Sequence, residues 1–270
     1  MTRTVLVQRR MGEAGPGKIE RIGKALFRWR SFTPLPLLFV AVPLLWRSRG
    51  GGGPAWTFAG IALCVAGQAV RAWVLGQVPD GTSGQNERLI ATELNTSGPY
   101  AHTRNPLYLG NFLITLGVCL VAHDPILLAL VAVLFAAQYR AIVAAEEGFL
   151  RARFGPAFDD YFARVPRFWP RLRAASGPSA PWSFRRALRK EHNPLAAWSA
   201  LLVALLASDQ VARARAAGAP ATLRGYGLLP HAVLLLVILA AWLAAKAWKH
   251  RWTRGGFTED LRRRLRETAR

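Results

Sequence analysis

Long apolar runs alternate with short charged connections along most of this sequence. A helix needs roughly 20 apolar residues to cross a bilayer, and six runs come close enough to that length to be interpreted as spanning helices. These runs cover residues 32–46, 56–78, 106–122, 125–145, 194–207 and 228–248. The pattern therefore predicts an all-α, polytopic integral membrane protein with about six transmembrane helices.

Three of the predicted helices have local features that shape the expected bundle. Residues 32–46 contain three prolines, so we expect a kinked or irregular helix there. The run at 194–207 is marginal in length. Only a His-Asp-Pro break separates 106–122 from 125–145, which leaves room for a tight turn and makes these two helices antiparallel neighbours.

The positive charges follow the predicted topology. The chain has 36 Lys and Arg against 15 Asp and Glu, and a cytoplasmic N-terminus would put 30 of the 36 on the cytoplasmic side. We therefore expect both termini in the cytoplasm and basic tails that contact anionic headgroups. The charges lie between apolar runs and not along one soluble face, which argues against nucleic acid as a partner. The excess of Arg over Lys and the many Ala favour a bacterial source, and hence the inner membrane.

Several other classes of protein and site lack support in the sequence. No apolar centre with a cleavage site marks the first 31 residues as a signal peptide. The glycine run at 50–53 is followed by Pro and not by Lys-Ser/Thr, and no dinucleotide-binding fingerprint occurs. Both cysteines lie in apolar runs, and no His or Cys spacing typical of a metal site is present, so we expect no metal.

The segment "SGPYAHTRNPLYLGN", residues 97–111, gathers polar groups directly before an apolar helix. Pro106 suits the first helical position, and Asn105 is then expected to be the N-cap, with its side-chain oxygen accepting a backbone N–H. Unpaired N–H groups at this helix start, with Arg104 beside them, form a candidate site for a carboxylate or phosphate. Arg104 as an ordinary interfacial anchor is the alternative.

The end of the following helix supplies the opposite charge. Glu146 and Glu147 follow an uninterrupted apolar stretch and point about 100° apart on a helix. One is expected to face the space between the two helices while the other meets Arg104 or Arg140. We predict that Arg104, Asn105, Tyr108, Glu146 and Glu147 meet in one cytoplasmic pocket. A short amphipathic helix within 153–171 either covers this pocket or packs at the interface.

With these motifs in order, the chain resembles the isoprenylcysteine carboxyl methyltransferase and phospholipid methyltransferase superfamily. The resemblance covers about residues 56–171, where the family pattern is G-x-Y-x-x-x-R-H-P-x-Y-x-G, then Glu-Glu, then an F-G-x-x-Y segment. It implies an integral-membrane enzyme that uses S-adenosylmethionine. By motif position it implies that the cofactor is lined by seven residues: Tyr100, Arg104, Asn105, Pro106, Tyr108, Glu146 and Glu147.

The resemblance also implies a lipophilic methyl acceptor, such as an isoprenylcysteine carboxylate, a phospholipid amine or a similar small molecule. Arg104, Asn105 and His102 are the candidate catalytic residues. Asn105 stands where the family has His, and Phe158 where it tends to have Tyr, so His102 is a possible substitute for the missing imidazole. An NADPH-dependent membrane reductase and an inactive membrane scaffold remain the alternatives.

The predicted organisation has three parts. Residues 1–31 form a basic cytoplasmic tail, 32–175 the methyltransferase core, and 176–270 an extension with two further membrane segments and a basic end. The sequence determines neither the acceptor nor the oligomeric state, and it gives the extension no role.

Overall fold

The structure is a computed structural model. It describes residues 22, 23, 25, 26, 53–78, 91, 93–173 and 180–268, and the side chains among them up to residue 249. The predicted helix at 32–46 and almost all of the N-terminal tail lie outside the described residues.

Every regular element in the described part of the chain is a helix, which confirms the all-α prediction. The helices are α4 (Pro54–Gln77), α5 (Pro99–His102), α6 (Pro106–Val121), α7 (Pro125–Phe154), α8 (Pro156–Arg164), α9 (Phe184–Ala216) and α10 (Leu229–Thr268). Among the described residues, four stretches are long and apolar enough to cross a membrane: α4, α7, α9 and the part of α10 from Leu229 to Lys249. The predicted span at 106–122 appears as the 16-residue α6, which is shorter than a usual span.

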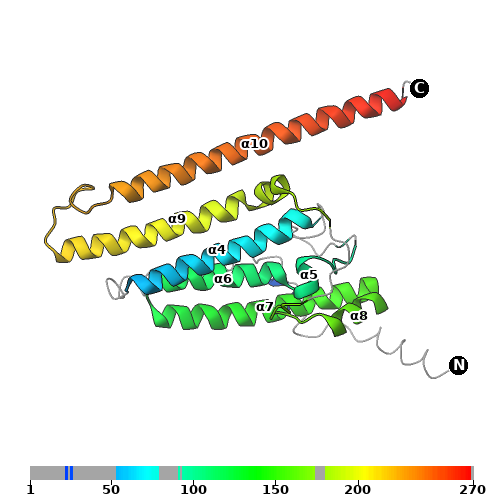
Figure 1. Ribbon diagram of the computed structural model, residues 1–270, viewed down its shortest axis with the longest axis horizontal. Helices are drawn as coiled ribbons and strands as arrows, with labels where there is room; N and C mark the ends of the chain where they lie inside the picture. Colours follow the sequence, from blue (N-terminus) through cyan, green and yellow to red (C-terminus); the bar gives the residue numbers. More distant parts are fainter. Residues whose placement is uncertain are drawn as a thin grey trace.

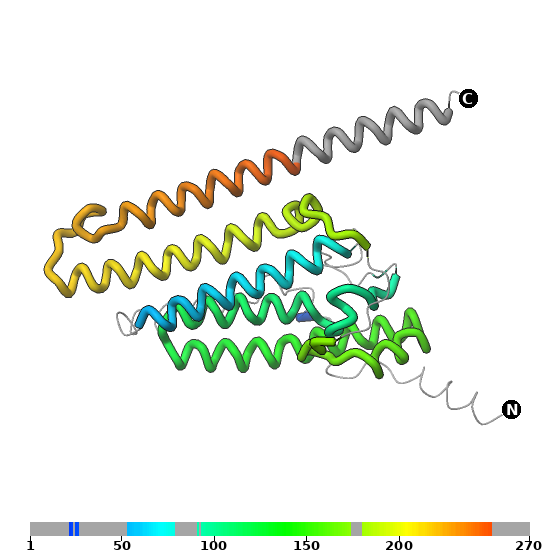
Figure 2. Tube along the Cα trace, viewed as in Figure 1, coloured from blue at the N-terminus to red at the C-terminus, as the bar shows by residue number. Residues whose placement is uncertain are grey.

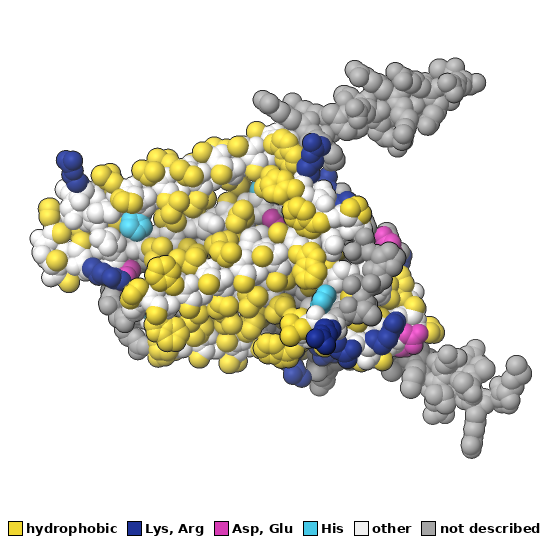
Figure 3. Space-filling view, viewed as in Figure 1, with side chains coloured by type: hydrophobic (Ala, Val, Ile, Leu, Met, Phe, Trp, Pro, Cys, Tyr) yellow, Lys and Arg dark blue, Asp and Glu magenta, His cyan; other side chains and the backbone are white. Residues whose placement is uncertain are grey.

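The five longest helices of the described part lie side by side in the order α10, α9, α4, α6 and α7 (Figures 1 and 2). The short helices α5 and α8 gather at one end of this bundle. Hydrophobic side chains cover much of the visible face, while Lys and Arg collect mainly at its two ends (Figure 3). This distribution is what a bundle surrounded by lipid requires.

Glycines allow α4 and α6 to approach each other closely. A Cβ added at Gly67 would lie 2.5 Å from the carbonyl oxygen of Gly110, and one added at Gly60 would lie 2.6 Å from that of Gly117. Small residues at such crossings let backbones touch, which gives van der Waals packing that lipid cannot replace. This contact fixes the start of α6, and therefore Arg104 and Asn105, relative to α4.

The predicted tight turn between α6 and α7 is present. Asp124 caps α7, because its carboxylate accepts from the backbone N–H groups of Ile126 at 2.9 Å and Leu127 at 2.8 Å. His123 takes a positive φ of 56° to reverse the chain. The two helices are thus antiparallel neighbours, as the short connection predicts.

The predicted helix at 194–207 is too short at both ends, since α9 covers Phe184–Ala216 and continues through Pro194. The Ser183 hydroxyl oxygen accepts from the N–H of Arg186 at 3.3 Å and starts the helix ten residues before the proline. The first turns of α9 are polar, so a pattern of apolar residues does not reveal them. They nevertheless face the bundle, because Glu191 and His192 are buried.

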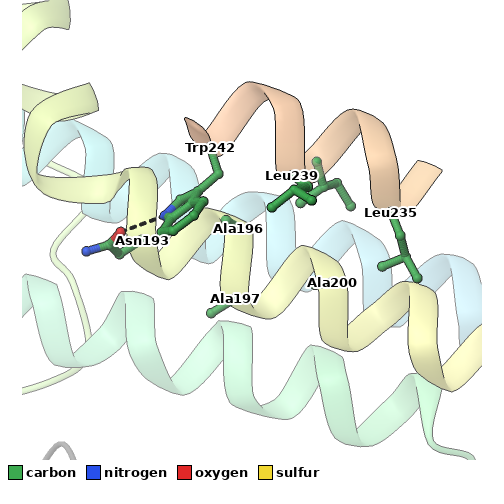
Figure 4. Close-up of a pocket in the computed structure, with 8 residues that line it drawn as sticks. Asn193, Ala196, Ala197, Ala200, Leu235, Leu239 and Trp242 are labelled. Carbon is green, nitrogen blue, oxygen red and sulfur yellow. Dashed lines mark hydrogen bonds between the residues drawn. The ribbon is translucent and has the colours of Figure 1, made fainter. Parts of the chain in front are cut away.

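Helix α10 packs along α9 and leaves an apolar groove between them (Figure 4). Ala196, Ala197 and Ala200 of α9 form one side, and Leu235 and Leu239 of α10 contribute to the other. At one end of the groove, the indole N–H of Trp242 donates to Asn193 at 2.8 Å. The apolar stretch of α10 buries none of its residues inside the structure, so α10 is held through α9.

Candidate functional site

The candidate site lies where α5, the start of α6, the end of α7 and α8 meet (Figure 1). Two segments pair through their backbones there: Arg104 N–H donates to the carbonyl of Pro166 at 2.9 Å, and Arg171 N–H donates to that of His102 at 3.0 Å. The Thr103 hydroxyl donates to the carbonyl of Arg167 at 3.1 Å. The loop before α6 is therefore fixed against the segment that follows α8.

Arg104 is buried at the centre of this junction, with 8% of its side chain exposed. Its guanidinium lies 3.2 Å from a carboxylate oxygen of Glu147, donates to the carbonyl of Phe162 at 2.7 Å, and lies 3.8 Å from the centre of the Phe162 ring. Burial lowers the pKa of Arg104; Glu147 opposes this shift, and the nearby Arg167 adds to it. Among the described residues, no hydrogen-bond partner meets its buried Nε.

Glu147 is shared between two arginines. Besides Arg104, it accepts from Arg167, whose Nε donates at 3.1 Å and whose terminal nitrogen forms a second, ion-paired contact. Sequence reasoning missed Arg167, although it lies in the segment compared with the family. The sequence does contain a signal for it: Arg167 follows the amphipathic helix closely, and the two acids Glu146 and Glu147 need positive partners.

Glu146 turns to a different partner. The Tyr108 hydroxyl donates to its carboxylate at 2.5 Å. One glutamate thus meets Arg104 and the other meets Tyr108, as the angle between neighbouring helical residues predicts. Because α7 has 30 residues and about 20 are enough to cross the hydrocarbon core, a span that begins at Pro125 would end before both acids.

Asn105 stands at the N-cap of α6, but the predicted capping bond is wrong. Its side chain makes no cap hydrogen bond; instead its amide nitrogen donates to the carbonyl of Arg167 at 2.9 Å. The side chain is drawn away from the helix because the segment after α8 presents that carbonyl beside it. Pro106 does occupy the first position of α6, as predicted.

A known protein family matches the segment that contains the start of α6 and most of α7. Residues 55–157 match the phospholipid methyltransferase family. The match includes Arg104, Tyr108, Glu146 and Glu147, and it confirms the resemblance seen in the motifs.

Two curated bacterial proteins are similar to part of the chain. The nickel-cobalt-cadmium resistance protein NccN of Alcaligenes xylosoxydans xylosoxydans is 43% identical over 82 residues. The cobalt-zinc-cadmium resistance protein CzcN of Cupriavidus metallidurans is 41% identical over 86 residues. These alignments cover 30% and 32% of this chain, and 38% and 39% of the relatives. No solved structure matches the chain at a significant level.

The remaining predicted residues, Tyr100 and His102, make contacts beside the Arg104–Glu147 pair. The Tyr161 hydroxyl donates to the backbone carbonyl of Tyr100 at 2.9 Å, and burial raises the pKa of Tyr161. The His102 ring bonds the carbonyl of Arg171 at 2.6 Å and lies 5.5 Å from the ring of Trp73. His102 therefore has partners of its own outside the group formed by Arg104, Arg167 and Glu147.

The predicted amphipathic helix is α8, and it packs directly on the site. Phe158 and Tyr161 are buried, with exposures of 1% and 4%, and Phe162 contributes the ring that lies against Arg104. The phenyl ring of Phe158, where the family tends to have Tyr, meets both Tyr161 and Phe162. Of the two predicted roles for α8, packing is present, while covering a bound cofactor stays a prediction.

Proposed function

We propose that this protein is an integral-membrane methyltransferase that uses S-adenosylmethionine and acts on a lipophilic acceptor. The observation that carries the proposal is that the phospholipid methyltransferase match, residues 55–157, contains the paired Arg104, in the loop before α6, and Glu147, on α7. Acceptors consistent with the family are an isoprenylcysteine carboxylate, a phospholipid amine or a similar small lipid.

The charges at the site suit this cofactor. S-adenosylmethionine carries a carboxylate, an ammonium group and ribose hydroxyls, and the site offers two arginines and two glutamates. The unpartnered Nε of Arg104 is a donor that a carboxylate would satisfy, since a buried polar group without a partner is costly. Arg104 and the N-terminal turn of α6 would hold the cofactor carboxylate, and Glu146 or Glu147 its amino or ribose groups.

Bound there, the cofactor supplies a sulfonium methyl group that is already activated for transfer. The task left to the protein is to align the acceptor and exclude water. Phe162 and the rest of α8 lie where they would shield the site from the cytoplasm. A carboxylate acceptor needs no base, whereas an amine or thiol must lose a proton, for which His102, Glu146 and Glu147 are the candidates.

The proposal includes an orientation and a division of the chain. The cofactor enters from the cytoplasm and the acceptor from the bilayer, with both termini on the cytoplasmic side of a bacterial inner membrane. Residues 32–175 form the core, preceded by the basic tail 1–31 and followed by the extension 176–270.

The direct test uses the purified full chain in nanodiscs made from bacterial lipid extract. Incubation with methyl-labelled S-adenosylmethionine should place label in the organic extract, and Arg104→Ala should abolish it. Absence of cofactor binding at millimolar concentration in calorimetry would overturn the proposal. Saturable binding of NADPH in its place would identify a reductase. Label transfer only after Asn105→His would identify wild-type protein as an inactive scaffold.

The names of the two relatives suggest a setting for this activity. Both are called metal resistance proteins, and we extend that process to this chain as part of the proposal. Expression in a cobalt-sensitive bacterium should raise tolerance, and Glu147→Gln should remove the gain if methyl transfer causes it. Equal tolerance with wild type and the variant would separate resistance from the proposed chemistry.

A further inference from the structure

An ion pair connects the extension to the methyltransferase segment. Arg71 of α4 and Glu191 of α9 meet through two parallel contacts: Nε to Oε2 at 2.9 Å, and a terminal nitrogen to Oε1 at 2.6 Å. Their side chains are 14% and 4% exposed. Glu191 lies beyond residues 55–157, so neither the family match nor its motifs include it.

The pair is also hydrogen-bonded to neighbouring polar side chains. Gln68 donates to Glu191 Oε2, the oxygen that also accepts from Arg71 Nε, at 2.8 Å. The side-chain carbonyl oxygen of Gln68 accepts from the Trp198 indole at 2.8 Å. Arg71 lies within the apolar helix α4, which is a candidate membrane span. Ionisable groups in such helices are expensive and generally mark function. Packing alone would be achieved at least as well by apolar residues of similar volume.

The polar contacts continue from Arg71 to the candidate site. A terminal nitrogen of Arg71 donates to the amide oxygen of Asn111, and the amide nitrogen of Asn111 donates to the Tyr139 hydroxyl at 3.2 Å. The Tyr139 ring meets the Tyr108 ring edge-on, with centroids 4.6 Å apart. Tyr108 in turn donates to Glu146 at 2.5 Å. An unbroken series of contacts thus joins α9 to Glu146.

The contacts made by Arg71 and Glu191 show whether the pair is a ligand site or a support for neighbouring side chains. All three guanidinium nitrogens of Arg71 and both carboxylate oxygens of Glu191 have protein partners. A site that waits for a ligand would leave some of these groups available, as the Nε of Arg104 is. The pair is therefore suited to holding neighbouring side chains in place.

We propose that Glu191 is a positioning residue for the methyltransferase site. It fixes Arg71, and through Asn111 and Tyr139 it sets the orientation in which Tyr108 bonds Glu146. The role of Tyr108 and Glu146 in cofactor binding rests on the proposed function, but the positioning itself does not. The extension then belongs to the functional unit through its first helix, α9.

The first test needs no ligand. The chain has only five tyrosines, so 3-fluorotyrosine labelling gives a simple ¹⁹F NMR spectrum in nanodiscs. Tyr108→Phe, Tyr139→Phe and Tyr226→Phe assign three of the five signals. Glu191→Gln, which keeps the shape of the side chain and removes its charge, should shift both signals and leave that of Tyr226 in place.

A matched control comes from the other end of the same helix. Asp209 pairs with Arg213, whose side chain is 58% exposed, so Asp209→Asn also removes one acid from an ion pair. It should move neither Tyr108 nor Tyr139. Unchanged Tyr108 and Tyr139 signals in a folded Glu191→Gln variant, or equal shifts in the control, would overturn the inference.

The second test measures the consequence for the cofactor. Glu191→Gln should weaken S-adenosylmethionine binding by about tenfold, a typical size for residues coupled through packed networks. In a Tyr108→Phe background the same change should have almost no further effect, because its route to the site is already broken. If the affinity loss in the double variant equals the product of the losses in the two single variants, the route through Tyr108 is contradicted. Shifted tyrosine signals without cofactor binding by wild type would instead refute the proposed function alone.

Discussion

Arg104 and Glu147 form a buried ion pair, with nitrogen and oxygen 3.2 Å apart, between the loop that starts α6 and the last turns of α7. Both side chains are less than a tenth exposed. Arg167 is a second arginine on Glu147, so two cations share this one carboxylate. An anionic group that reached Arg104 would meet a cation whose charge Glu147 only partly offsets.

The first prediction concerns the acid of this pair. Glu147→Gln should weaken S-adenosylmethionine binding at least tenfold, because the variant leaves two arginines without their carboxylate and removes an acceptor for the cofactor. Arg104→Ala should have a similar effect through the loss of the cofactor carboxylate's partner. Isothermal titration calorimetry on purified protein measures both.

An exposed ion pair near the site provides the control. Arg151 and Asp159 lie 2.7 Å apart with about half of each side chain exposed, so Asp159→Asn removes a charge at little cost. Its cofactor affinity should equal that of wild type. If the Glu147 and Arg104 variants also bind normally while remaining folded by circular dichroism, the candidate site is misplaced.

A second prediction separates two roles of Asn105. As a cap, Asn105 would be replaced well by Asp, which is an equally good N-cap and has the favourable charge for a helix start. In the structure its amide instead donates to the carbonyl of Arg167, which a carboxylate cannot do. Asn105→Asp should therefore lower the free energy of unfolding by about 1–3 kcal/mol.

Asn105→His is the matched comparison, because a ring N–H is able to donate to the same carbonyl. In thermal denaturation followed by circular dichroism, the thermal midpoint of Asn105→His should lie closer to that of wild type than the midpoint of Asn105→Asp does. Greater stability of the Asp variant than of wild type would restore the capping role.

The sequence was sufficient to predict what depends on local pattern. The apolar runs locate α4, α6, α7 and the membrane part of α10, and the Pro106 signal locates the start of α6 correctly. The grouping of Arg104, Tyr108, Glu146 and Glu147 followed from one short turn, since neighbouring antiparallel helices bring the end of one beside the start of the other.

What depends on distant parts of the chain was not predictable in this way. The polar first turns of α9 carry no apolar pattern, and the partner that buries Glu191 is Arg71, far earlier in the chain. Asn105 was assigned a local cap because the competing carbonyl belongs to Arg167, on a segment that returns only after α8. Sequence spacing does not reveal such contacts.

A third prediction tests the close approach of α4 and α6. In Gly67→Ala the new Cβ would lie 2.5 Å from the Gly110 oxygen and 2.9 Å from the backbone nitrogen of Ile114, so the helices must separate. We expect a loss of about 1–3 kcal/mol in unfolding free energy, despite the better helix propensity of Ala. Denaturant titration in mixed micelles measures it.

The comparison for this change is Gly53→Ala at the start of the same helix. A Cβ there meets no atom within 4 Å, and the backbone φ of −78° suits any residue. Its loss should stay below about 1 kcal/mol, the usual range for an N-cap position. If both variants lose the same unfolding free energy, the effect of Gly67→Ala comes from the reduced flexibility of the backbone and not from the contact between α4 and α6.

The last prediction uses the hydroxyl of Tyr161, which burial keeps protonated to a pKa above its ordinary value of 10.0. The unfolded chain loses this proton near pH 10, while the folded chain keeps it and the bond to the Tyr100 carbonyl. The stabilising contribution is therefore complete below pH 10 and falls as the pH rises toward the folded pKa.

Between about pH 9 and 11, the thermal midpoint of wild type should fall more steeply than that of Tyr161→Phe, which has no proton to lose. Scanning calorimetry across this range measures the two slopes. Parallel curves for wild type and Tyr161→Phe would mean that Tyr161 ionises alike in the folded and unfolded chain.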